Sequence, residues 1–181
     1  MSIVDSFNKK TTREILQDNQ ARSKVKGMCR INVLLHNIRS MHNVGSVFRS
    51  ADATGIGEII LSGYTPTPPR SEITKTALGA EEFVNWSFKD SVTDYLKTEK
   101  SKGTKIIGIE QTHESTSILE FNPNPINEYL LIFGNEVKGI DDEIMPFIDQ
   151  CIEIPQFGEK HSFNISVTVG IVFYHFMKSY H

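Results

Sequence analysis

Three polar segments of the chain contain residue types that bind ligands or activate a hydroxyl group. They are residues 37–49, 134–139 and 154–164, and their candidate side chains are Asn43, Arg49, Glu136, Ser162 and Asn164. A guanidinium binds phosphate or developing negative charge, a carboxylate holds donors in place, and amides and hydroxyls orient a substrate. The six histidines have no metal-ligand spacing. The residue types therefore indicate a site that works through positioning and charge.

Each polar segment directly follows an apolar run with the length of a strand. The runs are residues 31–35, 129–133 and 151–154. Helical patterns alternate with strand patterns along the chain, which predicts an α/β fold with a mainly parallel sheet covered by helices on both faces. Ligands bind at the carboxyl ends of the strands in such open sheets. We therefore expect the polar segments to form the site there.

Asn43 and Arg49 lie in a predicted helix with a helical spacing of apolar residues. The apolar positions are Val44, Val47, Phe48 and Ala51, and Gly55 is a good C-terminal stop. Near the helix start the Asn43 amide can cap backbone N–H groups, and Gly45 permits a close backbone approach. Arg49 lies beside the apolar stripe. It is either a functional cation or an exposed side chain paired with Asp52.

The second and third segments also have simpler explanations. Glu136 follows a strand end, where carboxylates bind or position ligands, but a tight turn with a surface Glu is the alternative. Ser162 is the expected N-cap of the last helix. Asn164 would then lie two positions inside that helix, and capping does not explain a polar residue at the head of an apolar helix.

Capping and turn residues predict further elements. Thr11 and Glu14 form a capping-box pattern, and the helix that they begin is expected to run to about Lys26 before Gly27. Further strands are expected at 58–62 and 106–109, a helix at 91–100, and a loop at the proline-rich 64–69.

The last helix is apolar on nearly every side. One face carries Ile165, Val169, Val172 and Phe176, and another carries Val167, Ile171 and Tyr174. A helix of this kind must be buried, and a terminal helix of a small domain is hard to bury within its own chain. We therefore expect it to pack against a second copy of the protein. The alternative is an unusually deep position within one copy.

Length and composition exclude several classes of protein. The 181 residues, of which 39% are hydrophobic and 23% charged, fit one compact domain. No apolar run is long enough to span a membrane, and the polar N-terminus is unlike a secretory signal. Cys29 and Cys151 form neither a disulfide framework nor a metal cluster, so a reducing cytoplasm is expected.

The net charge of −3 conceals an uneven distribution. Residues 1–30 carry a net charge of +4, whereas residues 31–181 carry −7. The cations of this basic arm are Lys9, Lys10, Arg13, Arg22, Lys24, Lys26 and Arg30. The arm is either an element that binds a polyanion or a solvated surface helix.

Taken together, the three segments resemble the motifs of the SpoU (TrmH-like) family of the SPOUT superfamily of RNA methyltransferases. The first motif is NVGSVFRSAD at 43–52, the second is IFGNEVKGI at 132–140, and the third comprises Ile154-Pro155, Gly158 and SFNISV at 162–167. The resemblance covers about residues 31–178. It implies a SPOUT methyltransferase domain over 31–181, preceded by the helical extension 1–30, with a deep trefoil knot in about 134–181 and a homodimer formed through the C-terminal helix.

The resemblance also implies a role for each matching residue. Arg49 matches the catalytic arginine, and Asn43, Glu136, Ser162 and Asn164 match polar positions near the active site. Gly134, Ile154 and Phe163 match positions that contact the methyl donor, S-adenosylmethionine. Phe163 departs from the leucine that is usual in the family, and its larger ring could reshape the adenine pocket.

The implied activity is methylation of an RNA ribose 2′-hydroxyl without a metal. We expect a tRNA substrate, with the D-loop guanosine as a candidate target, because the chain lacks a separate RNA-binding domain. Alternatives are a wobble-position tRNA or rRNA methyltransferase, or a non-catalytic RNA-binding module on the same fold. A nucleotide- or flavin-binding domain is disfavoured because the chain has no phosphate-binding loop.

Overall fold

A computed structural model describes residues 8–22, 30–159 and 162–179. Its centre is a seven-stranded sheet in the order β3-β2-β1-β6-β4-β7-β5 with every neighbouring pair parallel. The strands are β1 (Ile31–His36), β2 (Glu58–Ser62), β3 (Asn85–Lys89), β4 (Lys105–Ile109), β5 (Thr116–Ser117), β6 (Tyr129–Phe133) and β7 (Gln150–Glu153). The parallel α/β prediction is confirmed, and β3 and β5 are additions to it.

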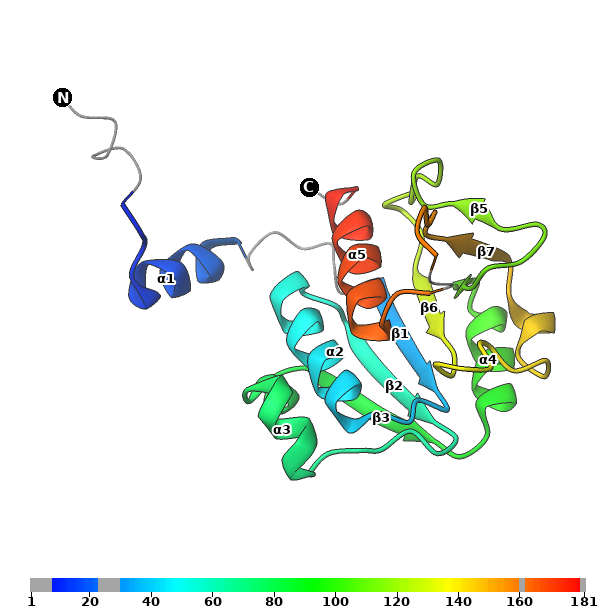
Figure 1. Ribbon diagram of the computed structural model, residues 1–181, viewed down its shortest axis with the longest axis horizontal. Coiled ribbons are helices and arrows are strands. Elements are labelled where there is room, and N and C mark those ends of the chain that lie inside the picture. The colour runs from blue at the N-terminus through cyan, green and yellow to red at the C-terminus, as the bar shows by residue number, and fades with distance from the viewer. Residues whose placement is uncertain (1–7, 23–29, 160–161, 180–181) are drawn as a thin grey trace.

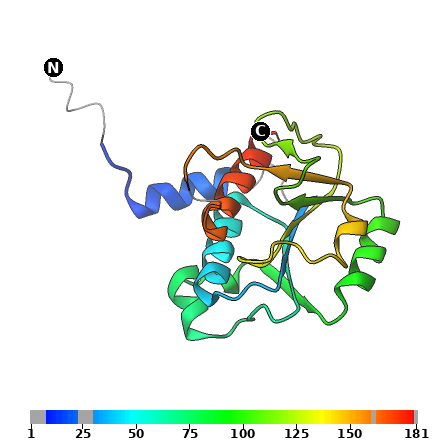
Figure 2. The same cartoon turned by 45° about the vertical axis from the view of Figure 1, so that its right-hand side comes forward.

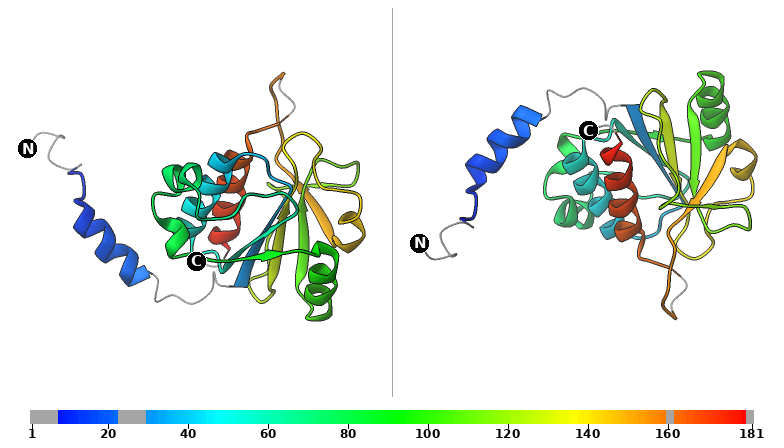
Figure 3. Two further views of the ribbon diagram at one scale, coloured as in Figure 1. Left: turned by 90° about the horizontal axis from the view of Figure 1, so that it is seen from below. Right: turned by 90° about the horizontal axis from the view of Figure 1, so that it is seen from above.

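Helices cover both faces of the sheet (Figures 1 and 3). They are α1 (Thr12–Arg22), α2 (Met41–Thr54), α3 (Ser71–Ala77), α4 (Val92–Ser101) and α5 (Ile165–Lys178), with short 3-10 turns at Ala80–Glu82 and Met145–Phe147. Alternate residues of β1 serve the two faces: Val33 and Leu35 pack with α2 and α5, whereas Leu34 packs with α4. The continuous apolar strands are therefore explained by burial on both sides.

The basic arm includes α1, which begins with the predicted capping box. The Thr11 backbone N–H donates to Glu14 Oε2 at 2.7 Å, and the Glu14 N–H donates to Thr11 Oγ1 at 3.3 Å. Figures 1 and 3 show α1 standing away from the sheet and its covering helices, whereas in the view of Figure 2 one end of α1 overlaps these helices in projection. The expected end of this helix at Lys26 and Gly27 lies outside the described residues.

The structure corrects two predicted helix caps. Helix α2 is capped by Ser40, whose side chain accepts the Asn43 backbone N–H, so the Asn43 amide is free for another contact. Helix α5 is capped by Asn164, whose side-chain oxygen accepts the Ser166 N–H at 2.8 Å. Ser162 is therefore not the N-cap, because the helix begins two residues later than its hydroxyl suggested.

Gly45 is explained by packing between helices. A Cβ atom at this position would lie 2.1 Å from Thr76 Oγ1 and 2.3 Å from the carbonyl oxygen of Ile73. The close approach that the sequence predicted is therefore the approach of α3 to α2.

Helix α5 has one buried and one exposed apolar face. Val169, Val172 and Phe176 are fully buried against the sheet and α2. On the other face, Val167 is 48% and Tyr174 65% exposed. An unusually deep position of α5 within one copy is thus wrong, because the described part of the chain leaves this outer face, which also includes Ile171 at 36%, partly exposed.

Candidate functional site

The carboxyl ends of β4, β6 and β7 open into a cavity of about 520 Å³. Its lining comes from residues in segments 109–111, 133–139, 152–156 and 162–168. The second and third polar segments therefore meet at one cavity, as the sheet topology predicts. The predicted site residues that line it are Gly134, Glu136, Ile154, Ser162, Phe163 and Asn164.

The lining of this cavity is acidic. Glu110, Glu136 and Glu153 contribute carboxylates, and none of the described lining residues is Lys, Arg or His. Apolar side chains, among them Ile154 and Phe163, form other parts of the wall. Such a cavity favours a ligand that combines apolar surface with a positive charge, and it disfavours a polyphosphate.

Glu136 links the first two polar segments. Its carboxylate accepts the backbone N–H groups of Arg39 at 3.0 Å and Ser40 at 3.2 Å, and the Asn43 amide at 3.2 Å. Burial raises the pKa of Glu136, but these hydrogen bonds outweigh it and hold the pKa below its ordinary value of 4.5. Glu136 is therefore more than a surface Glu in a turn: it fixes the segment that leads into α2.

The two glycines of the second segment allow the chain to fold back tightly. Asn135 and Gly139 exchange backbone hydrogen bonds of 2.8 and 2.9 Å. A Cβ atom at Gly134 would lie 2.3 Å from the Gly139 carbonyl carbon. A Cβ atom at Gly139, where φ is +73°, would lie 2.2 Å from Glu110 Oε2. Both glycines are thus required by the turn itself.

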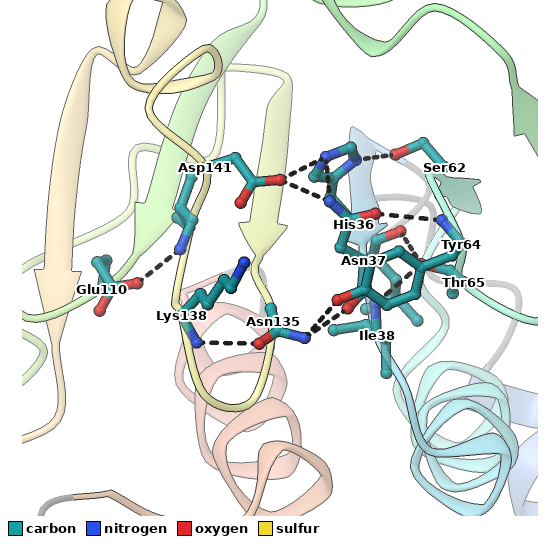
Figure 4. Close-up of polar contacts among 12 residues, drawn as sticks. His36, Asn37, Ile38, Ser62, Tyr64, Thr65, Glu110, Asn135, Lys138 and Asp141 are labelled. Atoms are coloured by element: carbon teal, nitrogen blue, oxygen red, sulfur yellow. Dashed lines mark hydrogen bonds and ion pairs between the residues drawn. The ribbon is translucent and has the colours of Figure 1, made fainter.

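A polar network that the sequence did not reveal ties this turn to the end of β1 (Figure 4). The buried His36 ring lies between Ser62 Oγ at 2.7 Å and Asp141 Oδ2 at 3.1 Å. The Asn37 amide also donates to Asp141. Asn135 donates to the Asn37 carbonyl oxygen at 2.9 Å. The sequence signal that could have revealed this network is the polar pair His36 and Asn37, which follows the apolar run of β1. Asn37 adopts a φ of +57°, a conformation that asparagine tolerates better than most residues.

Arg49 does not line the cavity. It is exposed on α2 and takes part in none of the ion pairs among the described residues, so the pairing with Asp52 is wrong. The structure thus brings Asn43 and the cavity residues together, and it leaves Arg49 on the outer surface of the same helix.

The described cations of the basic arm lie apart from the cavity. Lys9 and Arg13 are exposed, Lys10 forms an ion pair with Asp18, and Arg22 ends α1. Arg30 precedes β1 and donates to the Ile126 carbonyl oxygen at 2.9 Å, which places it at the amino end of the sheet. Lys24 and Lys26 lie outside the described residues.

The comparison with known families identifies the arrangement of these segments. The model of the SpoU rRNA Methylase family matches residues 30–174, which include all three polar segments. The chain belongs to this family.

Two curated relatives are examples. The chain is 27% identical over 166 residues to the tRNA (guanosine(18)-2'-O)-methyltransferase of Aquifex aeolicus, covering 91% of this chain and 73% of the relative. It is 29% identical over 140 residues to the 23S rRNA (guanosine-2'-O-)-methyltransferase RlmB of Neisseria meningitidis serogroup B, covering 77% of this chain. The chain spans about half the length of that second relative, 55%.

Solved structures support the fold. The A. aeolicus TrmH/SpoU tRNA modifying enzyme matches with a TM-score of 0.77 at 24% identity, covering 91% of this chain and 84% of that one. The AdoMet-bound rRNA methyltransferase from Sinorhizobium meliloti matches with a TM-score of 0.75 at 23% identity, covering 82% and 56%.

The described residues contain neither a candidate metal cluster nor a membrane-spanning helix. Among those residues there is no cluster of three His, Cys, Asp or Glu side chains that could hold a metal ion. No helix in the described ranges has the length and hydropathy to cross a membrane. Cys151 is a free cysteine, and Cys29 lies outside the described residues.

Proposed function

We propose that this chain is an S-adenosylmethionine-dependent RNA ribose 2′-O-methyltransferase and that its substrate is tRNA, with a D-loop guanosine as the target. The observation that carries the proposal is the acidic cavity built from the second and third SpoU segments, with the first segment fixed to it through Glu136. The names of the A. aeolicus and N. meningitidis relatives support the reaction, and the first of them supports tRNA.

The cavity residues fit the proposed cofactor. S-adenosylmethionine, when bound, supplies an electrophilic methyl group on a positively charged sulfonium. The three carboxylates of the lining attract the positive charges of that molecule, and no described Lys, Arg or His in the lining opposes them. Ile154 and Phe163 supply the apolar surface that an adenine ring requires. Gly134, Ile154 and Phe163, the positions that the resemblance matches to contacts with the methyl donor, all line this cavity.

The protein's own residues have the task of aligning and stabilising. Glu136 holds Asn43 and the start of α2 against the cavity, which fixes where a ribose can enter. Asn164 and Ser162 present polar groups to the same cavity. Arg49 is a poor general base because a guanidinium offers N–H donors and no acceptor for a proton. Its role in the proposal is to hold an RNA phosphate, which can accept the hydroxyl proton, or the developing alkoxide.

The finer architecture is part of the proposal. The chain is taken as a basic extension, 1–30, and a methyltransferase domain, 31–181, with a trefoil knot in about 134–181. Support for the knot comes from the path of the chain after β6. The chain passes β4 to form β7 on the far side of that strand, and it then returns to form α5, which packs beside α2. Support for a homodimer comes from the exposed apolar face of α5.

The first test is substitution of Arg49. In Arg49→Ala, methyl transfer to RNA from labelled cofactor is expected to fall on the order of 100-fold or more, while cofactor affinity measured by calorimetry stays unchanged. Asp52→Ala, one turn further along the same exposed surface, is the control and keeps its activity. Near-normal turnover by Arg49→Ala would remove this residue from the mechanism.

The second test identifies the substrate. Mass-spectrometric mapping of 2′-O-methyl groups in RNA from cells with and without the gene should show a missing tRNA mark. A change confined to rRNA would replace tRNA by rRNA as the substrate, and a lost wobble-position mark would replace the D-loop. Binding of RNA and cofactor without any transfer would favour a non-catalytic module.

A further inference from the structure

A second hollow, of about 550 Å³, lies beside the cavity at the carboxyl ends of β4, β6 and β7, which we call the cofactor cavity. The proposed methyl transfer does not use this hollow. Its lining residues come from the start of α2, the loop after β2, the start of α3 and the strand β3, and Figure 1 labels these helices and strands. Three aromatic side chains line it: Tyr64 from the loop, and Trp86 and Phe88 from β3. We call it the aromatic pocket.

The aromatic side chains of this pocket are unusually open for their size. Trp86 and Phe88 align with the buried Ile59 and Leu61 of β2, so they project from the same face of the sheet. Because β3 is the edge strand, Trp86 remains 36% and Phe88 39% exposed. Large aromatic surfaces left open in a hollow typically mark a binding site.

The charge of the pocket is opposite to that of the cofactor cavity. Arg39 and Arg70 line it, both are exposed, and neither takes part in an ion pair with a described residue. No Asp or Glu is present among the described residues of the lining. Such a pocket suits an unstacked nucleotide, because aromatic rings stack on the base and the unpaired guanidinium groups bind its phosphate.

The two hollows share a wall. The backbone N–H of Arg39 donates to Glu136 in the cofactor cavity at 3.0 Å. The Asn135 amide donates to the Tyr64 hydroxyl at 2.8 Å, as Figure 4 shows. A nucleotide in the aromatic pocket would therefore lie next to one that presents its ribose to the cofactor cavity.

We propose that the aromatic pocket binds an unstacked base of the RNA substrate, stacked against Trp86 and Phe88, with an adjoining phosphate on Arg39 and Arg70. This proposal rests on the proposed function, since it concerns the same RNA. The pocket holds a nucleotide next to the methylated one, and it gives the enzyme a contact with single-stranded or loop RNA that a fully paired helix could not make.

The chain's single tryptophan makes the test direct, because Trp86 fluorescence reports on this pocket alone. A single-stranded RNA hexamer is expected to quench Trp86 fluorescence. An abasic hexamer with the same phosphates, or S-adenosylhomocysteine alone, is expected to leave it unchanged. In Phe88→Ala and in Arg70→Ala the hexamer should bind on the order of tenfold more weakly.

Matched controls come from exposed residues outside the pocket. Phe83→Ala removes an aromatic ring that is 79% exposed, and Lys75→Ala removes a cation of α3; both should keep normal quenching. In methylation assays, Phe88→Ala should raise KM for RNA with cofactor binding unchanged.

The outcomes separate this proposal from the proposed function. Methylation of RNA without any quenching, or equal quenching by the abasic hexamer, would overturn the base-binding pocket and leave the methyltransferase intact. Quenching by the hexamer, together with no methyl transfer to tRNA or rRNA, would uphold the pocket and count against the enzyme. Concentration-dependent quenching without RNA would assign the pocket to a second protein copy and overturn the proposal.

Discussion

Glu136 shows how a residue picked out for chemistry can act through the fold. Its carboxylate lies at the start of α2, where backbone N–H groups favour negative charge. The sequence placed it correctly after a strand. It could not reveal the partners, because Arg39 and Asn43 lie more than 90 residues away and meet Glu136 only since β6 pairs with β1.

Glu136 should make stability depend on pH on the acidic side. Because its pKa is lowered in the folded state, its stabilising effect is complete above about pH 4.5 and is lost as the pH falls below that value. Glu136→Gln should therefore lower the free energy of unfolding at pH 7 by on the order of 1 kcal/mol, a figure that allows for solvent screening at this partly exposed carboxylate.

Urea unfolding of both proteins at pH 7 and at pH 3.5 measures this effect. The difference between them should shrink at the lower pH. Glu143→Gln, at an exposed position, is the control and should match the parent protein at both. A difference for Glu136→Gln that is unchanged at pH 3.5 would contradict the assignment.

Asn164 and Ser162 offer a second test at single residues. Asn164→Ala should cost about 0.5–2 kcal/mol of unfolding free energy, because the cap of α5 is lost. Ser162→Ala should cost little, since its hydroxyl does not cap the helix. Asn164→Asp keeps an acceptor and should largely restore stability. Thermal or urea unfolding measures all three, and a larger loss for Ser162→Ala would favour the cap expected from sequence.

At the scale of elements, burial explains what could be predicted. The central strands β1 and β6 are continuous apolar runs because helices cover both of their faces, so the sequence identified them to within a residue. Strand β3 was missed because its alternation is short: only Trp86 and Phe88 of its five residues are apolar, too few for a clear period. Strand β5 has two residues, too few for any periodic signal.

The exposed apolar face of helix α5 predicts the oligomeric state of the protein. If its outer face joins two copies, the protein should have a mass near twice 20.5 kDa in sedimentation analysis. Ile171→Glu places a charge on that face and should shift the mass toward 20.5 kDa. Leu119→Glu, at a residue that is 79% exposed elsewhere, is the matched control. A parent protein that sediments as a single copy at micromolar concentration would exclude this interface.

At the scale of the whole molecule, charge is divided among separate regions. The cavity at the carboxyl ends of β4, β6 and β7 is acidic, the neighbouring aromatic pocket is basic, and the arm at residues 1–30 carries a net charge of +4. The total of −3 averages these regions, so composition alone hides them. The arm's charge was readable from sequence, whereas the pocket required the fold to bring residues 39, 70 and 86 together.

Removal of residues 1–30 tests the arm. The shortened protein should bind RNA more weakly, with a shallower dependence of affinity on salt, because phosphate contacts are lost. Its cofactor affinity should be unchanged, since none of the described residues of the arm, 8–22 and 30, lines the cavity. Filter binding at several salt concentrations measures the first effect, and calorimetry measures the second. An unchanged salt dependence would make α1 a solvated surface helix.

If Arg30 contacts the RNA, as the proposed role of the arm requires, the parallel sheet sets a minimum size for the substrate. Arg30 lies at the amino end of β1, and the cavity lies at the carboxyl ends of the neighbouring strands. The six residues of β1 span about 20 Å. An RNA that touches Arg30 while its ribose enters the cavity must reach across that distance. The length of β1 thus sets the distance between these two RNA contacts. This distance favours methylation of folded RNA over short fragments that fill the cavity alone.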